Sequence, residues 1–116
     1  MQLLGIEKSQ AHILVDLLDY VPHSVVARTI VQKITGNIIA IAIDSGEALE
    51  EKISPFDTYI QIIEGESEIV IDNCSTILAT GQAILVPAHT ANLIRANNPS
   101  KMVVTVIKSG YEGISI

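Results

Sequence analysis

Short runs of β-branched and aliphatic residues, separated by turns that contain glycine, asparagine or proline, fill the chain from residue 25 to residue 108. Such runs are typical of strands, because branched side chains pack well on a pleated surface. The expected strands span residues 25–32, 38–44, 58–63, 67–71, 76–79, 83–86, 90–96 and 101–108. Many short strands with glycine turns between them predict an all-β sandwich or barrel.

The chain has 116 residues, which is enough for one hydrophobic core and too few for two. We expect residues 23–116 to form a single β-barrel domain and residues 1–22 to form an N-terminal extension. Within that extension, residues 11–18 fit either a short helix or an edge strand. Pro22 then interrupts the pattern.

Composition restricts the partners that this chain is expected to bind. The formal net charge is -6, and the 7 Lys and Arg residues are scattered, so no basic surface for nucleic acid or anionic lipid is expected. The longest apolar run, residues 38–43, is too short to cross a bilayer. A single cysteine, Cys74, cannot form an internal disulfide, and the first residues lack the pattern of a secretion signal. A cytoplasmic location is therefore expected.

Five elements of the sequence form a recognisable frame: Gly46, Pro55-Phe56-Asp57, Gly65, Gly81 and Pro87. Their spacing resembles the two glycine-anchored motifs of the cupins, a superfamily of small jelly-roll β-barrels. The resemblance covers roughly residues 35–108. It implies a cupin-like jelly roll, but it leaves the activity open, because one fold carries many functions.

The positions of the family's metal ligands hold other residue types here. Lys52 and Ser54 stand at the two histidine positions of the first motif, Thr58 at its glutamate position, and Asn92 at the histidine position of the second motif. The family usually holds a divalent metal through imidazoles and a carboxylate. A lysine cation repels a metal, and hydroxyls and amides are weak ligands for transition metals. We therefore expect no metal and no other cofactor.

Three residues of a ligand type lie close to these positions: Glu51, Asp57 and His89. A register shift of one residue would turn the first two inward, but it would also bring Gln61 into the core. The same shift would expose two isoleucines of the strand 58–63, at a cost of about 3–6 kcal/mol. A bulge that re-aims a single residue remains an alternative.

The cupin resemblance, together with strand parity, implies which side chains line the barrel interior. The expected pocket-lining residues are Lys52, Ser54, Thr58, Ile60 and Asn92, whereas Glu51 and Asp57 are expected on the opposite face. Lys52 is the best catalytic candidate, because an amine that loses its hydration is able to act as a base or as a nucleophile toward carbonyls. The alternative is that its ammonium bends to the barrel mouth and pairs with neighbouring carboxylates.

Asp57 and His89 are candidate substrate contacts. The alternative for Asp57 is a carboxylate that forms a turn or caps a strand. His89 follows Pro87 at a bend, where the alternative is an exposed or interface histidine. Residues 47–51 are interpreted as a solvated acidic loop, Cys74 as part of a turn, and Tyr59 as a residue of the outer surface.

The strands at residues 38–43 and 101–108 carry apolar side chains on both faces. A strand of this kind must be covered on both sides, and in so small a chain the second cover is expected to be another subunit. The sequence therefore predicts a homodimer.

Three functions agree with these features. The first is a metal-free barrel that acts as a small-molecule-binding or accessory module, with a small polar ligand. The second is a metal-independent isomerase or epimerase that uses Lys52 with Asp57 or His89. The third is a purely structural dimer whose pocket is closed by side chains.

Overall fold

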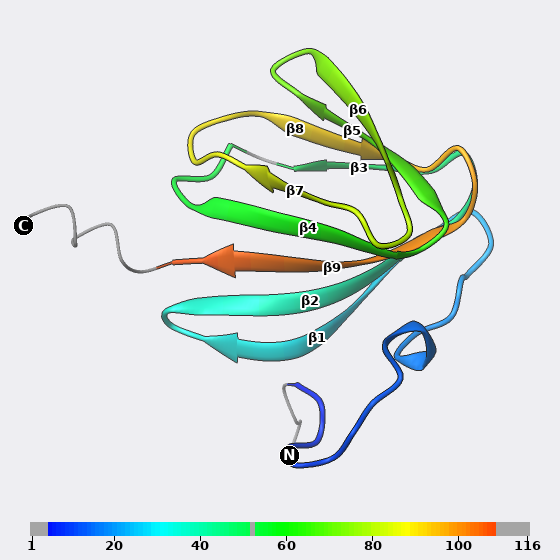
Figure 1. The fold of residues 1–116 in the computed structure, drawn as a ribbon, viewed down its shortest axis with the longest axis vertical. Helices are drawn as coiled ribbons and strands as arrows, with labels where there is room; N and C mark the ends of the chain where they lie inside the picture. Colours follow the sequence, from blue (N-terminus) through cyan, green and yellow to red (C-terminus); the bar gives the residue numbers. More distant parts are fainter. Residues whose placement is uncertain (1–4, 52, 109–116) are drawn as a thin grey trace, which may run out of the picture.

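The computed structural model describes residues 5–51 and 53–108, with Glu51 described by its backbone. Within them, nine strands form two antiparallel sheets that lie face to face (Figure 1). The elements are a 3-10 helix η1 (Leu14–Asp16), β1 (Val25–Lys33), β2 (Gly36–Ile43), β3 (Ala48–Glu51), β4 (Asp57–Glu64), β5 (Glu66–Ile71), β6 (Cys74–Ala79), β7 (Ala83–Val86), β8 (Asn92–Arg95) and β9 (Ser100–Ile107).

The five-stranded sheet has the order β1-β2-β9-β4-β7, and the four-stranded sheet has the order β3-β8-β5-β6. Strands distant in the sequence are therefore neighbours, as in a jelly roll. The inner faces of the two sheets enclose the core, whose largest fully buried apolar side chains are Ile43, Ile60, Ile62, Ile69, Ile94 and Met102. Among the described residues, no helix has the length and apolar character needed to span a bilayer.

Strand β4 follows the alternation that its sequence predicts. Ile60 and Ile62 are 1% and 0% exposed, whereas Tyr59 is 39% exposed. Residues 57–62 pair with β9 without interruption, and the irregularity in this pairing falls after Ile62. The register is the unshifted one, and no bulge interrupts the pairing of Asp57 with β9.

Strand β3 corrects the interpretation of residues 47–51 as a solvated loop. Residues Ala48–Glu51 pair with β8, and Leu49 packs against the core. Glu51 pairs with Asn92 at the end of β3. Its side chain lies outside the described part of the structure, so its expected orientation stays a prediction. Cys74 likewise begins β6 and does not lie in the turn before it.

The N-terminal segment covers part of the outer face of the five-stranded sheet. Leu17 and Leu18 are buried against Ala40 and Ala42 of β2. Arg28 Nη1 of β1 donates a hydrogen bond of 2.7 Å to the carbonyl oxygen of Leu17. In this part of the sheet, the chain itself supplies the cover that we expected from a second subunit.

Lys101, a buried lysine of β9, also holds the N-terminal segment against the sheet. Lys101 Nζ donates to the carbonyl oxygen of Val15 at 2.5 Å, lies 3.9 Å from Glu64 Oε2, and stands 5.0 Å from the centre of the Tyr20 ring. The Tyr20 hydroxyl donates to Glu64 Oε2 at 2.5 Å. Burial, and then the bond to Glu64, raise the pKa of Tyr20 well above its ordinary value, so its hydroxyl remains a donor.

The turn between β4 and β5 requires glycine at position 65. Gly65 has a φ of 81°, and a Cβ atom there would lie 2.3 Å from the carbonyl oxygen of Pro99. Gly46 has a similar φ of 84°, but a Cβ atom there would meet nothing within 4 Å. The two positions therefore share the backbone strain of a substitution and differ in the steric clash.

We predict that Gly65→Ala lowers the free energy of unfolding by more than Gly46→Ala does. The positive φ costs about 1–2 kcal/mol at both sites. The clash with Pro99 adds about 1–3 kcal/mol at position 65 alone. Denaturant unfolding of the two variants beside the unmodified protein measures both losses. Equal losses would show that the contact with Pro99 relaxes freely.

Candidate functional site

An enclosed cavity of about 190 Å³ lies between the two sheets. Its walls come from strands of both sheets and from the loop that follows β3. The residues that line it are Asn37, Ile39, Ile41, Ser54, Thr58, Ile60, Asn92, Ile94, Val104 and Val106. Six of these ten are isoleucine or valine, so the cavity has an apolar body and a small set of polar groups.

The polar groups gather at one end of the cavity because of the strand pairing. Asn37 of β2 and Thr58 of β4 both pair with Val106 of β9, so the three residues form one row across the five-stranded sheet. Asn92 reaches the cavity from β8 of the opposite sheet. We call the four polar residues Asn37, Ser54, Thr58 and Asn92 the polar rim.

Two amide oxygens of the polar rim have no hydrogen-bond partner within the described part of the chain. Asn37 Oδ1 and Asn92 Oδ1 are both buried, and neither accepts a hydrogen bond from a described residue. Ser54, in contrast, is held in place: its hydroxyl oxygen accepts from the N–H of Phe56 at 3.1 Å, and its carbonyl oxygen accepts from the N–H of His89 at 2.6 Å. Both amide oxygens are therefore buried acceptors, and neither is exposed to the cavity.

The structure places Ser54, Thr58, Ile60 and Asn92 around the cavity. Lys52, the catalytic candidate of the sequence analysis, lies outside the described residues. Sequence reasoning missed Asn37, which was taken as part of the turn at residues 35–37. The available signal was its spacing of two and four residues from Ile39 and Ile41, which places all three on one face of β2.

The candidate substrate contacts Asp57 and His89 are not among the residues that line the cavity. Asp57 Oδ1 accepts a hydrogen bond of 2.9 Å from the N–H of Ala88, which ties β4 to the turn after β7. His89 is exposed and has a φ of 65°. In both cases the geometry is that of the alternative we gave, a turn-forming carboxylate and an exposed histidine.

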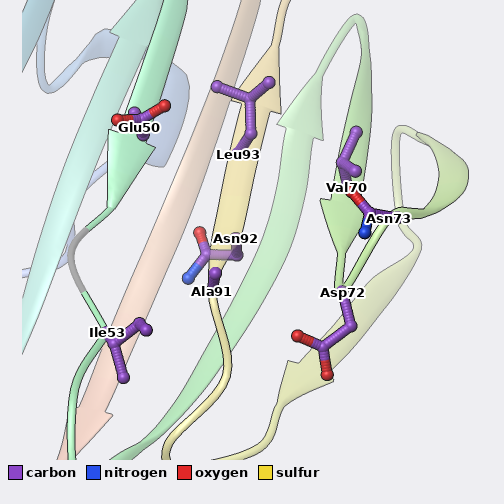
Figure 2. A pocket seen from close by; sticks show the side chains of 8 residues that line it. All are labelled: Glu50, Ile53, Val70, Asp72, Asn73, Ala91, Asn92 and Leu93. Atoms are coloured by element: carbon purple, nitrogen blue, oxygen red, sulfur yellow. The ribbon is translucent and has the colours of Figure 1, made fainter.

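A second, open hollow of about 480 Å³ lies beside the cavity. Figure 2 shows Ile53 and Asp72 on either side of Ala91 and Asn92, with Glu50 farther along β3. Asn92 lines both this outer hollow and the enclosed cavity. The outer hollow carries two carboxylates, whereas no described residue that lines the cavity is charged.

No family model and no curated protein sequence matches this chain. Solved structures do match. A conserved protein of unknown function from Streptococcus pyogenes is 27% identical with a TM-score of 0.85, over 95% of this chain and 97% of that one. A cupin superfamily protein from Desulfitobacterium hafniense is 22% identical with a TM-score of 0.84, over 94% and 100% of the two chains.

A third similar structure is an RmlC-like cupin protein from Desulfovibrio desulfuricans, which is 20% identical with a TM-score of 0.75 over 85% of this chain and 96% of that one. The chain has the cupin fold, an all-β, RmlC-like jelly roll of two antiparallel sheets. The fold predicted from the sequence is thereby confirmed.

The residues at the cavity do not fit the metal that this fold commonly holds. The described rim offers hydroxyl and amide oxygens, which transition metals bind weakly in comparison with imidazole or thiolate. In residues 5–51 and 53–108, no three side chains of histidine, cysteine, aspartate or glutamate come together in a group that is able to hold a metal ion. We derive no chemistry through a metal at this site.

Proposed function

We propose that this protein is a small-molecule-binding or accessory module that holds its ligand in the enclosed cavity without a metal. The observation that carries the proposal is the cavity itself, in which polar groups from both sheets converge on an apolar interior. Pockets with apolar walls and a few convergent polar groups are the usual form of small-molecule sites.

The size of the cavity limits the ligand. Its volume of about 190 Å³ is below the range of roughly 300–1,000 Å³ that is usual for drug-sized ligands. The proposed ligand is therefore a molecule of few non-hydrogen atoms. A purely structural barrel would be expected to fill this space with side chains, because protein interiors pack closely.

The first prediction for this function concerns metal content. Protein purified without chelator should contain far less than one equivalent of any transition metal per chain, because the rim lacks imidazole and carboxylate ligands in its described part. Elemental analysis of the purified protein measures this directly. About one equivalent of a single metal, retained through dialysis, would contradict the metal-free proposal.

The second prediction concerns binding. Some neutral fragments with fewer than ten non-hydrogen atoms should shift the amide NMR signals of β2, β4 and β8, because these strands supply the rim. The variant Val106→Phe, which places a ring in the cavity, should abolish these shifts. A fragment set that leaves these signals unchanged at millimolar concentration, or that shifts them equally in the filled variant, would contradict a ligand site in the cavity.

We also propose that the protein is a homodimer that associates through the outer face of the five-stranded sheet. Backbone pairing aligns Leu85, Tyr59, Thr105, Ile38 and Val31 in one row across this face. Leu85 and Tyr59 are 54% and 39% exposed, and the N-terminal segment packs elsewhere, against Ala40 and Ala42. A second copy with the same row would bury these side chains on both partners.

Light scattering coupled to size exclusion should therefore give the mass of a dimer at micromolar concentration. Leu85→Glu places a charge in the row and should shift the protein to a monomer. Ile77→Glu provides the matched control, because Ile77 is also exposed, at 56%, but belongs to the other sheet. A monomeric unmodified protein, or a loss of the dimer in the control alone, would contradict this assembly.

A further inference from the structure

One end of the five-stranded sheet carries two lysines and an exposed isoleucine. Lys33 and Ile34 lie at the turn between β1 and β2, and Lys108 lies beside them, because its N–H donates to the carbonyl oxygen of Thr35 at 2.8 Å. The three side chains line an open hollow of about 500 Å³, and Ile34 is 95% exposed. In the part of the chain that the structure describes, neither lysine is within salt-bridge distance of a carboxylate.

The N-terminal segment, residues 5–24, carries the opposite charge around η1. Asp16 and Asp19 are exposed, and neither forms a salt bridge with another described residue. Ile13 and Leu14, close to them in the chain, are 68% and 41% exposed. Figure 1 shows η1 and the turn between β1 and β2 at opposite ends of the sheet. The turn and the segment therefore complement each other in charge and apolar character, but they do not meet within one copy.

The spacing along β2 relates the turn to the segment. Ile38, which belongs to the row of the proposed dimer face, stands four residues from Ile34 and four from Ala42. At roughly 3.3 Å per residue, the two positions lie about 13 Å from the row, on opposite sides of it. Leu17 and Leu18 of the segment pack in the cluster that contains Ala42. A two-fold axis that runs along the row, across the strands, therefore places Ile34 of one copy at the segment of the other.

The alternative two-fold axis, parallel to β9, is unfavourable. It would bring the N-terminal segments of both copies to the same end of the interface, although each already covers the outer face of its own sheet there. The two segments would obstruct the approach of the sheets, and their aspartates would face like charges. An axis across the strands instead moves the segments to opposite ends.

We propose that the second copy docks with its two-fold axis across the strands, so that the turn between β1 and β2 of each copy packs on the N-terminal segment of the other. The lysines of the turn then face the aspartates of the segment, and Ile34 lies against the exposed apolar side chains there. A two-fold axis forms this contact twice, once at each end of the row. The inference rests on the homodimer proposed above, and it adds the residues that orient the two copies.

Exchange of the charges tests this contact. The variant Lys33→Glu/Lys108→Glu places carboxylates on the turn, and the variant Asp16→Lys/Asp19→Lys places amines on the segment. Each alone should raise the dissociation constant of the dimer about tenfold or more, because the pairs at both ends become repulsive. A 1:1 mixture should form a heterodimer with nearly the affinity of the unmodified protein, since both of its contacts again join opposite charges. Native mass spectrometry and light scattering at low salt measure both results.

The control is Glu50→Lys/Glu66→Lys, which changes the net charge as the segment variant does. Both glutamates are exposed and belong to the four-stranded sheet. This variant should dimerise at least as tightly as the unmodified protein, because it makes the net charge less negative. Thermal unfolding of all variants verifies that they are folded.

Cross-linking locates the axis independently of charge. In a Cys74→Ser background, Leu85→Cys stands in the row and so meets its own counterpart across the axis. Ile34→Cys lies about 26 Å from its own counterpart, twice its distance from the row. A short bis-maleimide should join Leu85→Cys to itself, leave Ile34→Cys monomeric, and join Ile34→Cys to Leu14→Cys in a mixture. Ile34→Cys that joins to itself, or Leu85→Cys that does not, would overturn the proposed axis.

The outcomes separate this inference from the homodimer. If the unmodified protein is a monomer, both are wrong. If it is a dimer that Leu85→Glu disrupts, but the charge variants dimerise as the unmodified protein does, the orientation is wrong and the homodimer stands. Charge variants that are monomeric alone and also in the mixture would equally contradict the reciprocal contact.

Discussion

The alternation of apolar and polar residues along the strands is the constraint on which the rest of this structure depends. In β4 and β8 the inward positions hold Ile60, Ile62 and Ile94, each at most 1% exposed. A shift of β4 by one residue would expose two isoleucines, at a cost of about 3–6 kcal/mol. Total stabilities are about 5–15 kcal/mol, so the register is fixed. The same alternation turns Thr58 and Asn92 toward the interior. The packing of the core therefore determines which side chains form the polar rim.

The jelly roll could be predicted from the sequence, because eight of its strands are recognisable as runs of branched residues between glycine and asparagine turns. Strand β3 does not, since Leu49 is the only large apolar residue among Ala48–Glu51. What makes it a strand is its pairing with β8, a contact between segments more than forty residues apart. The N-terminal segment is a similar case. Residues 11–18 were ambiguous by pattern, and their place is set by Ala40, Ala42 and the Lys101 amine.

The candidate site was predictable where a residue sits inside a regular strand and unpredictable where a turn signal intervened. Thr58 and Asn92 follow from parity with Ile60 and Ile94. Asn37 was missed because asparagine after Thr35-Gly36 is a strong turn signal, and local sequence cannot show that β2 already begins at Gly36. Asp57 was a candidate substrate contact. Its carboxylate instead accepts a hydrogen bond from the N–H of Ala88, which lies in a turn about thirty residues away, so the local sequence does not show this contact.

The polar rim is difficult to account for by folding alone. An unsatisfied buried acceptor costs about 1–3 kcal/mol, so two of them are a considerable fraction of the stability of a small domain. Leucine at either position would keep the volume and remove that cost, and the remaining lining is already isoleucine and valine. A cavity that merely remained open would therefore be expected to be apolar throughout. The two asparagines belong to different sheets and line the same cavity, so polar side chains stand at positions that close packing alone would fill with apolar ones.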